Sequence, residues 1–412
     1  MRALNLLTLL SLLLSSLLFA QEKNAELDAY ISENKKQQFS YDYEKNEAEG
    51  SKLRDSWIAP LRLNYSYNVS NPSGEDQKSQ SAAIKMDQPI FQSGGIYYGI
   101  KFANASKEYS DFSVDVAKRK MIKDAVSFLM QIKQTDLKEQ KQELQIKNSK
   151  INLALKEEQY MSGQLDSGFL DNAVIERNFV IQTLYDIQTA KERLVSSFST
   201  LSDLNYKNTS VPHLELLNEE EFLKHNIVLK VADSQIQRDR YSKNITTAKY
   251  LPQVSVTAGY NWSKSENQIF GIDPSNGVPI RSNNGIDYYD YGIRASMPLD
   301  INTFRDIESA RVDFLKSEVI KEDRVVQLKS VFEQVMQNLK NLDRKKVLSL
   351  ENREIYAKLL KDTKELYEAG YKTQMDVETL QNSVEISEIN AKIFEYDKQL
   401  ELLTLYEMYV NN

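Results

Sequence analysis

The chain has 412 residues, with 52 lysines and arginines against 59 aspartates and glutamates, no cysteine, 13 glycines and 8 prolines. The mildly acidic net charge argues against nucleic-acid binding, which needs a basic surface. The absence of cysteine excludes disulfides and the acylated cysteine of a lipoprotein. So few glycines and prolines favour long, uninterrupted helices.

The first residues carry the charge order of a secretory signal peptide. Arg2 precedes a leucine-rich run over residues 6–19, and Ala20 offers a small residue at a cleavage site. We therefore expect residues 1–20 to be a signal peptide and the chain to be exported, with a short N-terminal anchor as the alternative. Removing Arg2 changes the charge to 51 − 59 = −8.

A strand with one apolar face is predicted at residues 61–70, directly after Pro60. Apolar and polar residues alternate there with the period of two that is typical of a β-strand. A polar loop follows, and a second strand is predicted at residues 83–91, with Pro89 marking its exit.

Long helices then follow the strands. Residues 101–161 contain no proline, and they lead to Gly163 and a returning helix over residues 171–202. At 1.5 Å per residue, a helix of this length extends for roughly 90 Å. The glycine predicts the turn of a helix hairpin.

The same order of signals returns in the second half of the chain. Strands are predicted at residues 253–263 and 289–299, with Pro298 at the exit, and the loop between them is longer than in the first half. Helices over residues 304–369 and 373–410 flank Gly370, and the glycine offset of 370 − 163 = 207 is close to the proline offset of 298 − 89 = 209. The pattern predicts a duplication: a first repeat over 21–203, a connector over 204–218 and a second repeat over 219–412.

Four strands of about ten residues have the length needed to cross a bilayer as tilted β-strands. Because open strand edges are not tolerated in lipid, four strands must close a barrel together with other copies of the chain. Three copies give twelve strands and a lumen, whereas two copies give eight strands and a filled interior. We therefore expect a homotrimer with outer-membrane lipid around it. Aromatic girdles are expected from strand residues Tyr65, Tyr67, Tyr260, Trp262, Tyr288, Tyr289 and Tyr291.

The twofold order of strand pair, proline, long helix, glycine turn and return helix resembles the TolC-type outer-membrane efflux protein family. The resemblance implies an α+β membrane protein in which long coiled-coil hairpins continue a trimeric, twelve-stranded β-barrel. It further implies a passive exit duct across the periplasm and outer membrane, in a tripartite efflux or type I secretion system. A periplasmic adaptor and an inner-membrane transporter are the partners that it implies.

The most specific match is the second turn, residues 370–377, where a glycine, a basic residue and an aspartate have the spacing of the family's gate. The resemblance makes Tyr367, Lys372 and Asp376 candidate gate residues, and Gly163 and Gly370 candidate positions of adaptor docking. The alternatives are locally paired surface residues and ordinary helix-ending glycines.

The first turn departs from the family pattern. Phe169 stands six residues after Gly163, where the family's gate often has an aspartate, so Asp166 or Asp171 is the alternative partner of Lys372. In the second repeat, Thr379 stands where a further acidic residue is expected.

No catalytic, metal or cofactor site is predicted, because the sequence has two histidines, no thiol and none of the common metal or phosphate motifs. An exported coiled-coil scaffold or adhesin whose strands never enter a membrane is the competing hypothesis. Nothing in the sequence identifies a cargo.

Overall fold

The computed structural model describes residues 27–71 and 74–410, so the predicted signal peptide lies outside the described residues. The chain divides into two compact units. Of the described residues, those within 43–112 and 231–322 form one unit, which contains the sheet; those within 27–42, 113–230 and 323–410 form the other, which contains the tips of the helix hairpins.

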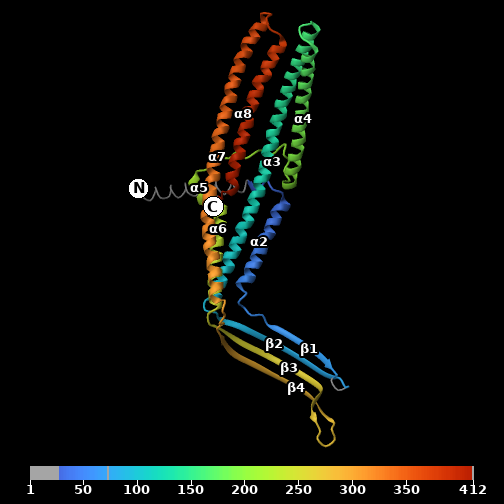
Figure 1. Cartoon of the computed structure of the whole chain (residues 1–412), viewed down its shortest axis with the longest axis vertical. Helices are drawn as coiled ribbons and strands as arrows, with labels where there is room; N and C mark the ends of the chain where they lie inside the picture. Colours follow the sequence, from blue (N-terminus) through green and yellow to red (C-terminus); the bar gives the residue numbers. More distant parts are fainter. Residues whose placement is uncertain (1–26, 72–73, 411–412) are drawn as a thin grey trace, which may run out of the picture. The chain divides into compact units, whose positions relative to one another are not determined.

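The sheet has four antiparallel strands in the order β1-β2-β3-β4 (Figure 1). The structure therefore confirms the four expected strands. The bounds of the strands are β1 (Arg62–Ser70), β2 (Gln77–Phe91), β3 (Gln253–Ile272) and β4 (Pro279–Ser296).

Three strands differ from the predicted limits. β2 begins earlier than predicted, and β3 and β4 extend through most of the stretch that we expected to be a loop, residues 263–285. Backbone pairing continues there because ladder hydrogen bonds do not depend on side-chain polarity, whereas the alternation of apolar residues ends earlier. The remaining turn is short, and Gly277 occupies it with a φ of 69°.

The two prolines expected at strand exits have different positions. Pro89 lies inside β2, where the register with β3 shifts between Pro89 and Phe91. Pro298 lies beyond the end of β4, which is Ser296. Because proline has no backbone N–H to donate, a bulge and a strand end are the places where it disturbs the ladder least.

Four helices form two hairpins, and both tips lie at the same end of the helical unit (Figure 1). Their limits agree closely with the predicted helices. The bounds are α3 (Gly95–Met161), α4 (Ser167–Leu201), α7 (Thr303–Glu368) and α8 (Gln374–Met408).

Within the described part of the chain, three shorter helices accompany them. Their bounds are α2 (Glu33–Arg54), α5 (Glu219–Lys224) and α6 (Ile227–Lys249). Between α5 and α6 the helix breaks at His225 and Asn226. The side-chain oxygen of Asn226, which is fully buried, accepts a hydrogen bond from the Val228 N–H at 2.9 Å and so begins α6.

The core of the helical unit lies where α3 meets α8. Along α8, apolar residues recur at alternating spacings of three and four residues from Ile386 to Leu403. Two of them, Ile389 and Ile393, form one buried cluster with Leu144 of α3, so this coiled-coil spacing marks the buried seam of the helix. Toward the other end of α3, Leu129 and Met130 are fully buried.

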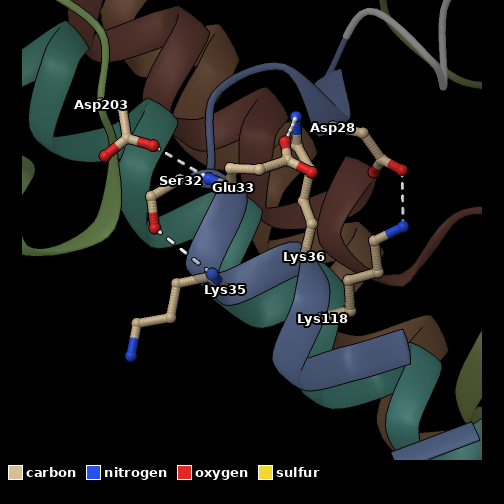
Figure 2. Close-up of polar contacts among 7 residues, drawn as sticks. All are labelled: Asp28, Ser32, Glu33, Lys35, Lys36, Lys118 and Asp203. Atoms are coloured by element: carbon tan, nitrogen blue, oxygen red, sulfur yellow. Dashed lines mark hydrogen bonds and ion pairs between the residues drawn. The ribbon is translucent and has the colours of Figure 1, made fainter. Parts of the chain in front are cut away.

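Polar contacts fix the beginning of α2 in this unit (Figure 2). The Glu33 N–H donates to the Asp203 carboxylate at 2.9 Å, and Lys118 on α3 lies 2.5 Å from the carboxylate of Asp28. These contacts join the N-terminal segment to the residues directly after α4 and to the long helix α3.

Lys191 interrupts the apolar run of α4 because it carries an ion-pair site. Its ammonium lies 2.8 Å from Asp136 and 2.5 Å from Glu139, both on α3. Burial alone lowers the pKa of Lys191, but the hydrogen bonds to the two carboxylates outweigh it and raise the pKa above its usual value. A cluster of one cation and two carboxylates thus replaces one apolar layer between α3 and α4.

Among the described residues, no helix has both the length and the hydrophobicity needed to span a membrane.

Candidate functional site

The two hairpin tips have the same backbone geometry. Gly163 has a φ of 75° and Gly370 a φ of 81°, in the left-handed region where residues with a side chain are strained. The N–H of Gln164 donates to the Gln159 carbonyl at 2.8 Å, and the N–H of Tyr371 donates to the Leu366 carbonyl at 2.9 Å. Both are the closing hydrogen bonds of a Schellman motif, so each long helix ends in the same way.

The returning helices begin with different caps. At the first tip, the Asp166 side chain accepts a hydrogen bond from the Gly168 N–H at 2.8 Å. At the second tip, the Thr373 hydroxyl accepts from the Asp376 N–H at 3.2 Å, and the Asp376 carboxylate accepts from the Thr373 N–H at 3.0 Å. The second tip therefore has a reciprocal capping box, which the first lacks.

The structure brings two of the three gate candidates together. Lys372 and Asp376 form an exposed ion pair with 3.9 Å between ammonium and carboxylate. The Thr373 N–H, followed by the Thr373 hydroxyl and the Lys372 ammonium, holds the pKa of Asp376 below its usual value. Tyr367 is 43% exposed, and its carbonyl accepts from the Gly370 N–H at 2.9 Å.

The first tip has an apolar residue at the position of Asp376. Phe169 follows its glycine by 169 − 163 = 6 residues, as Asp376 follows by 376 − 370 = 6, and Phe169 is 54% exposed. Asp166, one of the two alternative partners for Lys372, serves as the cap of α4. At the second tip, the Thr379 hydroxyl donates to the Met375 carbonyl at 2.8 Å.

The sheet has one apolar and one polar face. Directly opposed residues on antiparallel strands share a face, and the register places Leu63, Ile84, Tyr260 and Tyr289 in one row across all four strands. Leu63 is 74% exposed and Tyr289 is 76% exposed. An exposed apolar face of this extent requires lipid or another protein to cover it.

The neighbouring row shows the opposite face. Arg62 opposes Lys85, Lys85 opposes Gly259 and Gly259 opposes Asp290, so this face is charged. Tyr288 opposes Asn261 and lies on the polar face, which excludes it from the outward aromatic girdle that we predicted.

A family comparison matches residues 220–409 to the outer membrane efflux protein family, and this match spans α5 to α8. The solved structure of the outer membrane protein VceC from Vibrio cholerae is similar over 94% of this chain and 97% of its own, with a TM-score of 0.68 and 15% identity. The CmeC outer membrane channel of Campylobacter jejuni is similar over 94% of this chain and 86% of its own, with a TM-score of 0.69 and 13% identity.

Residues 220–409 thus match the outer membrane efflux protein family, and the chain shares its fold with solved outer-membrane channels. The MtrE outer membrane channel of Neisseria gonorrhoeae, in its open state, also shares the fold, with a TM-score of 0.62, 12% identity and coverage of 94% of this chain and 89% of MtrE. No curated protein matches the sequence significantly. At identities of 12–15%, these solved structures show the fold of the chain.

The helix α7 carries a second apolar seam, which the sequence pattern did not predict. Exposed side chains follow one another at spacings of seven, four and seven residues along the helix; they are Leu348, Ile355, Leu359 and Leu366. This is the spacing of a coiled-coil seam. When a helix has apolar residues on two sides, the sequence shows no single apolar stripe. The exposed seam of α7 is therefore masked in the sequence by the apolar residues that pack inside the chain.

Proposed function

We propose that this chain is the outer-membrane channel component of a tripartite efflux or type I secretion system. The observation that carries the proposal is the sheet, whose exposed apolar face and polar face extend across four strands. Alternation of this kind is what a barrel requires, with apolar side chains toward lipid and polar ones toward a lumen. We assign no catalytic step to the chain.

The proposed assembly is a homotrimer. The described sheet ends at β1 on one side and β4 on the other, and unpaired strand edges in lipid need partners. Joining β4 of one copy to β1 of the next gives twelve strands for three copies, within the range of water-filled barrels. The exposed seam on α7 supplies a second surface for such a neighbour, since coiled-coil spacing needs a facing helix.

The partners follow from the tips. Met161 is 85% exposed and Tyr371 is 80% exposed, beside Gly163 and Gly370. We propose that these tips receive a periplasmic adaptor, and that an inner-membrane transporter supplies the energy. The helices extend for roughly 100 Å at 1.5 Å per residue, a length suited to a tunnel across the periplasm.

A pair of tyrosine substitutions tests the membrane face. Tyr291 lies on the apolar face and is 82% exposed, whereas Tyr288 lies on the polar face of the same strand and is 52% exposed. A lysine on a lipid face costs roughly 2–4 kcal/mol at the bilayer midplane, while a lumen position tolerates it. We expect Tyr291→Lys to lower the amount of protein in the outer membrane, and Tyr288→Lys to leave it unchanged.

Membrane fractionation, the mass of the detergent-extracted protein and conductance in planar bilayers complete this test. We expect an outer-membrane protein with the mass of three copies that conducts ions. A monomer that needs no detergent would refute the channel and favour the exported coiled-coil scaffold or adhesin. Equal effects of the two lysine substitutions would refute the assignment of the faces.

We further propose that Tyr367, Lys372 and Asp376 contribute to a gate at the periplasmic end. An exposed ion pair contributes only about 0.2–1 kcal/mol, so such a gate opens at little cost per bridge. Combining Lys372→Ala with Asp376→Ala is expected to raise single-channel conductance.

The Asp376 carboxylate also belongs to the capping box of α8, so a control must distinguish an effect on the gate from an effect on the fold of the turn. Thr373→Ala removes the hydroxyl that caps the helix and keeps both charges. We expect Thr373→Ala to leave conductance unchanged. If it raises conductance as much as the double substitution, distortion of the turn explains the effect and the gate assignment is wrong.

A further inference from the structure

Two cations face each other on the polar side of the sheet. Arg62 on β1 and Lys85 on β2 are directly opposed in the register, and both are exposed. Within the described part of the chain, neither forms a salt bridge. Like charges in directly opposed positions of a sheet are unfavourable, so this pair carries a cost that an anion between the two groups relieves.

The other charges on this face neutralise the pair only in part. The guanidinium of Arg294 lies 3.4 Å from the carboxylate of Asp87, which leaves these two charges balanced. Asp290 lines the same hollow, and its carboxylate lies over Gly259, the residue between it and Lys85 in the register, while it accepts a hydrogen bond from the Asn261 side chain at 2.7 Å. The three cations and two carboxylates that line the hollow therefore leave a net charge of 3 − 2 = +1.

The cation pair borders a hollow of about 690 Å³ on the polar face. Asn64, the next residue of β1 on that face, lines the hollow as well, and its side-chain amide adds hydrogen-bonding capacity. The volume and the open polar lining leave room for a hydrated anion beside the two cations.

We infer that Arg62 and Lys85 form a weak anion site on the lumen wall, which favours small anionic solutes over cations in the duct. This inference rests on the proposed function, because it places the polar face of the sheet inside a water-filled barrel. Three copies bring three such pairs to one level of the barrel. Anionic groups at that level exchange rapidly, since a site that is exposed to water binds weakly enough to release its solute.

Ion selectivity of the purified trimer in planar bilayers tests this inference, with a potassium chloride gradient as the probe. In water, one unit charge at ~8 Å changes the local concentration of a monovalent ion about twofold. Because each charge acts on chloride and potassium in opposite directions, we expect the combination of Arg62→Gln and Lys85→Gln to lower the permeability of chloride relative to potassium by up to about sixteenfold at low salt, and by less where salt screens the charges. The protein mass and the existence of single channels verify that the variant still assembles.

Lys78→Gln is the matched control. Lys78 is on the same strand as Lys85, but it opposes Val69 and therefore lies on the apolar side of the sheet. We expect its removal to leave the chloride-to-potassium ratio unchanged. An unchanged ratio in the double variant, or an equal shift with Lys78→Gln, would overturn the anion site.

The single variants test whether both cations act. We expect Arg62→Gln and Lys85→Gln to contribute comparable shifts. If Lys85→Gln alone reproduces the whole effect, a carboxylate of a neighbouring copy neutralises Arg62 and the paired site is wrong. A wild-type protein that passes no current at all would instead refute the proposed channel, and this inference with it.

Discussion

The two hairpin tips share a backbone and differ in chemistry. Each long helix ends in a glycine with positive φ and the same Schellman hydrogen bond, but one return helix begins with Asp166 alone and the other with a Thr373–Asp376 box. At equivalent positions, the first tip has the exposed Phe169, and the second tip has Asp376, whose carboxylate completes the capping box. The comparison teaches that the turn geometry is independent of the side chains that follow it, which leaves those side chains available for function.

The largest effect is expected from substitution of the glycine that both tips share. Gly163→Ala and Gly370→Ala should each destabilise the tip by roughly 1–2 kcal/mol, because an added Cβ meets no neighbour and only the left-handed backbone opposes it. Hydrogen exchange of peptides that cover each tip measures this local opening. Gly99→Ala, in the interior of α3, is the control and should be neutral or stabilising. Clearly unequal losses at the two tips would break the equivalence of their backbones.

The next effect concerns the caps. Asp166→Ala and Thr373→Ala should each cost about 1 kcal/mol, because each leaves an N–H at the start of a helix without its acceptor. The same exchange measurement should show faster opening confined to the substituted tip, and Ser167→Ala, beside the first cap, should have little effect. Opening that spreads to the other tip would show that the two hairpins are coupled.

Low pH should destabilise the second tip more than the first. Because the pKa of Asp376 is lowered in the folded chain, the carboxylate contributes stability above its unfolded pKa of about 3.9, and the contribution is lost as the pH falls through the lower folded value. We expect the second tip to open more readily below about pH 4. Asp376→Asn should remove this pH dependence while retaining an acceptor for the Thr373 N–H. A second tip that is equally protected on both sides of pH 4 would contradict this account of the carboxylate.

The smallest expected effect makes the tips alike. Phe169→Asp places a carboxylate where it can accept from the cap residue's N–H and complete a box at the first tip. An acidic group in the first turn also interacts favourably with the helix dipole, so we expect a gain of about 0.3–1 kcal/mol in local stability. Slower hydrogen exchange at the first tip alone would verify this gain. Faster exchange there would show instead that packing of the Phe169 ring stabilises the tip.

The sheet and the α7 seam show where sequence interpretation succeeds and where it stops. Alternation identified the first strand almost to the residue, because a strand with one apolar face has a period of two. It placed the β3–β4 loop wrongly, because residues 264–272 lose the alternation while their backbones remain paired. The second seam on α7 escaped it, since apolar residues on two sides of a helix cancel as a pattern.

The sequence alone determined the number of strands, the long helices, the glycine turns and the buried seam of the last helix, because each depends on local periodicity or backbone preference. Only the tertiary structure decided that Arg62 opposes Lys85, that Tyr288 and Tyr289 lie on opposite faces, and that Asp376 caps its own helix. The physical reason is register: one residue of slip moves every side chain to the other face, and no local pattern specifies which residue of a neighbouring strand is the partner.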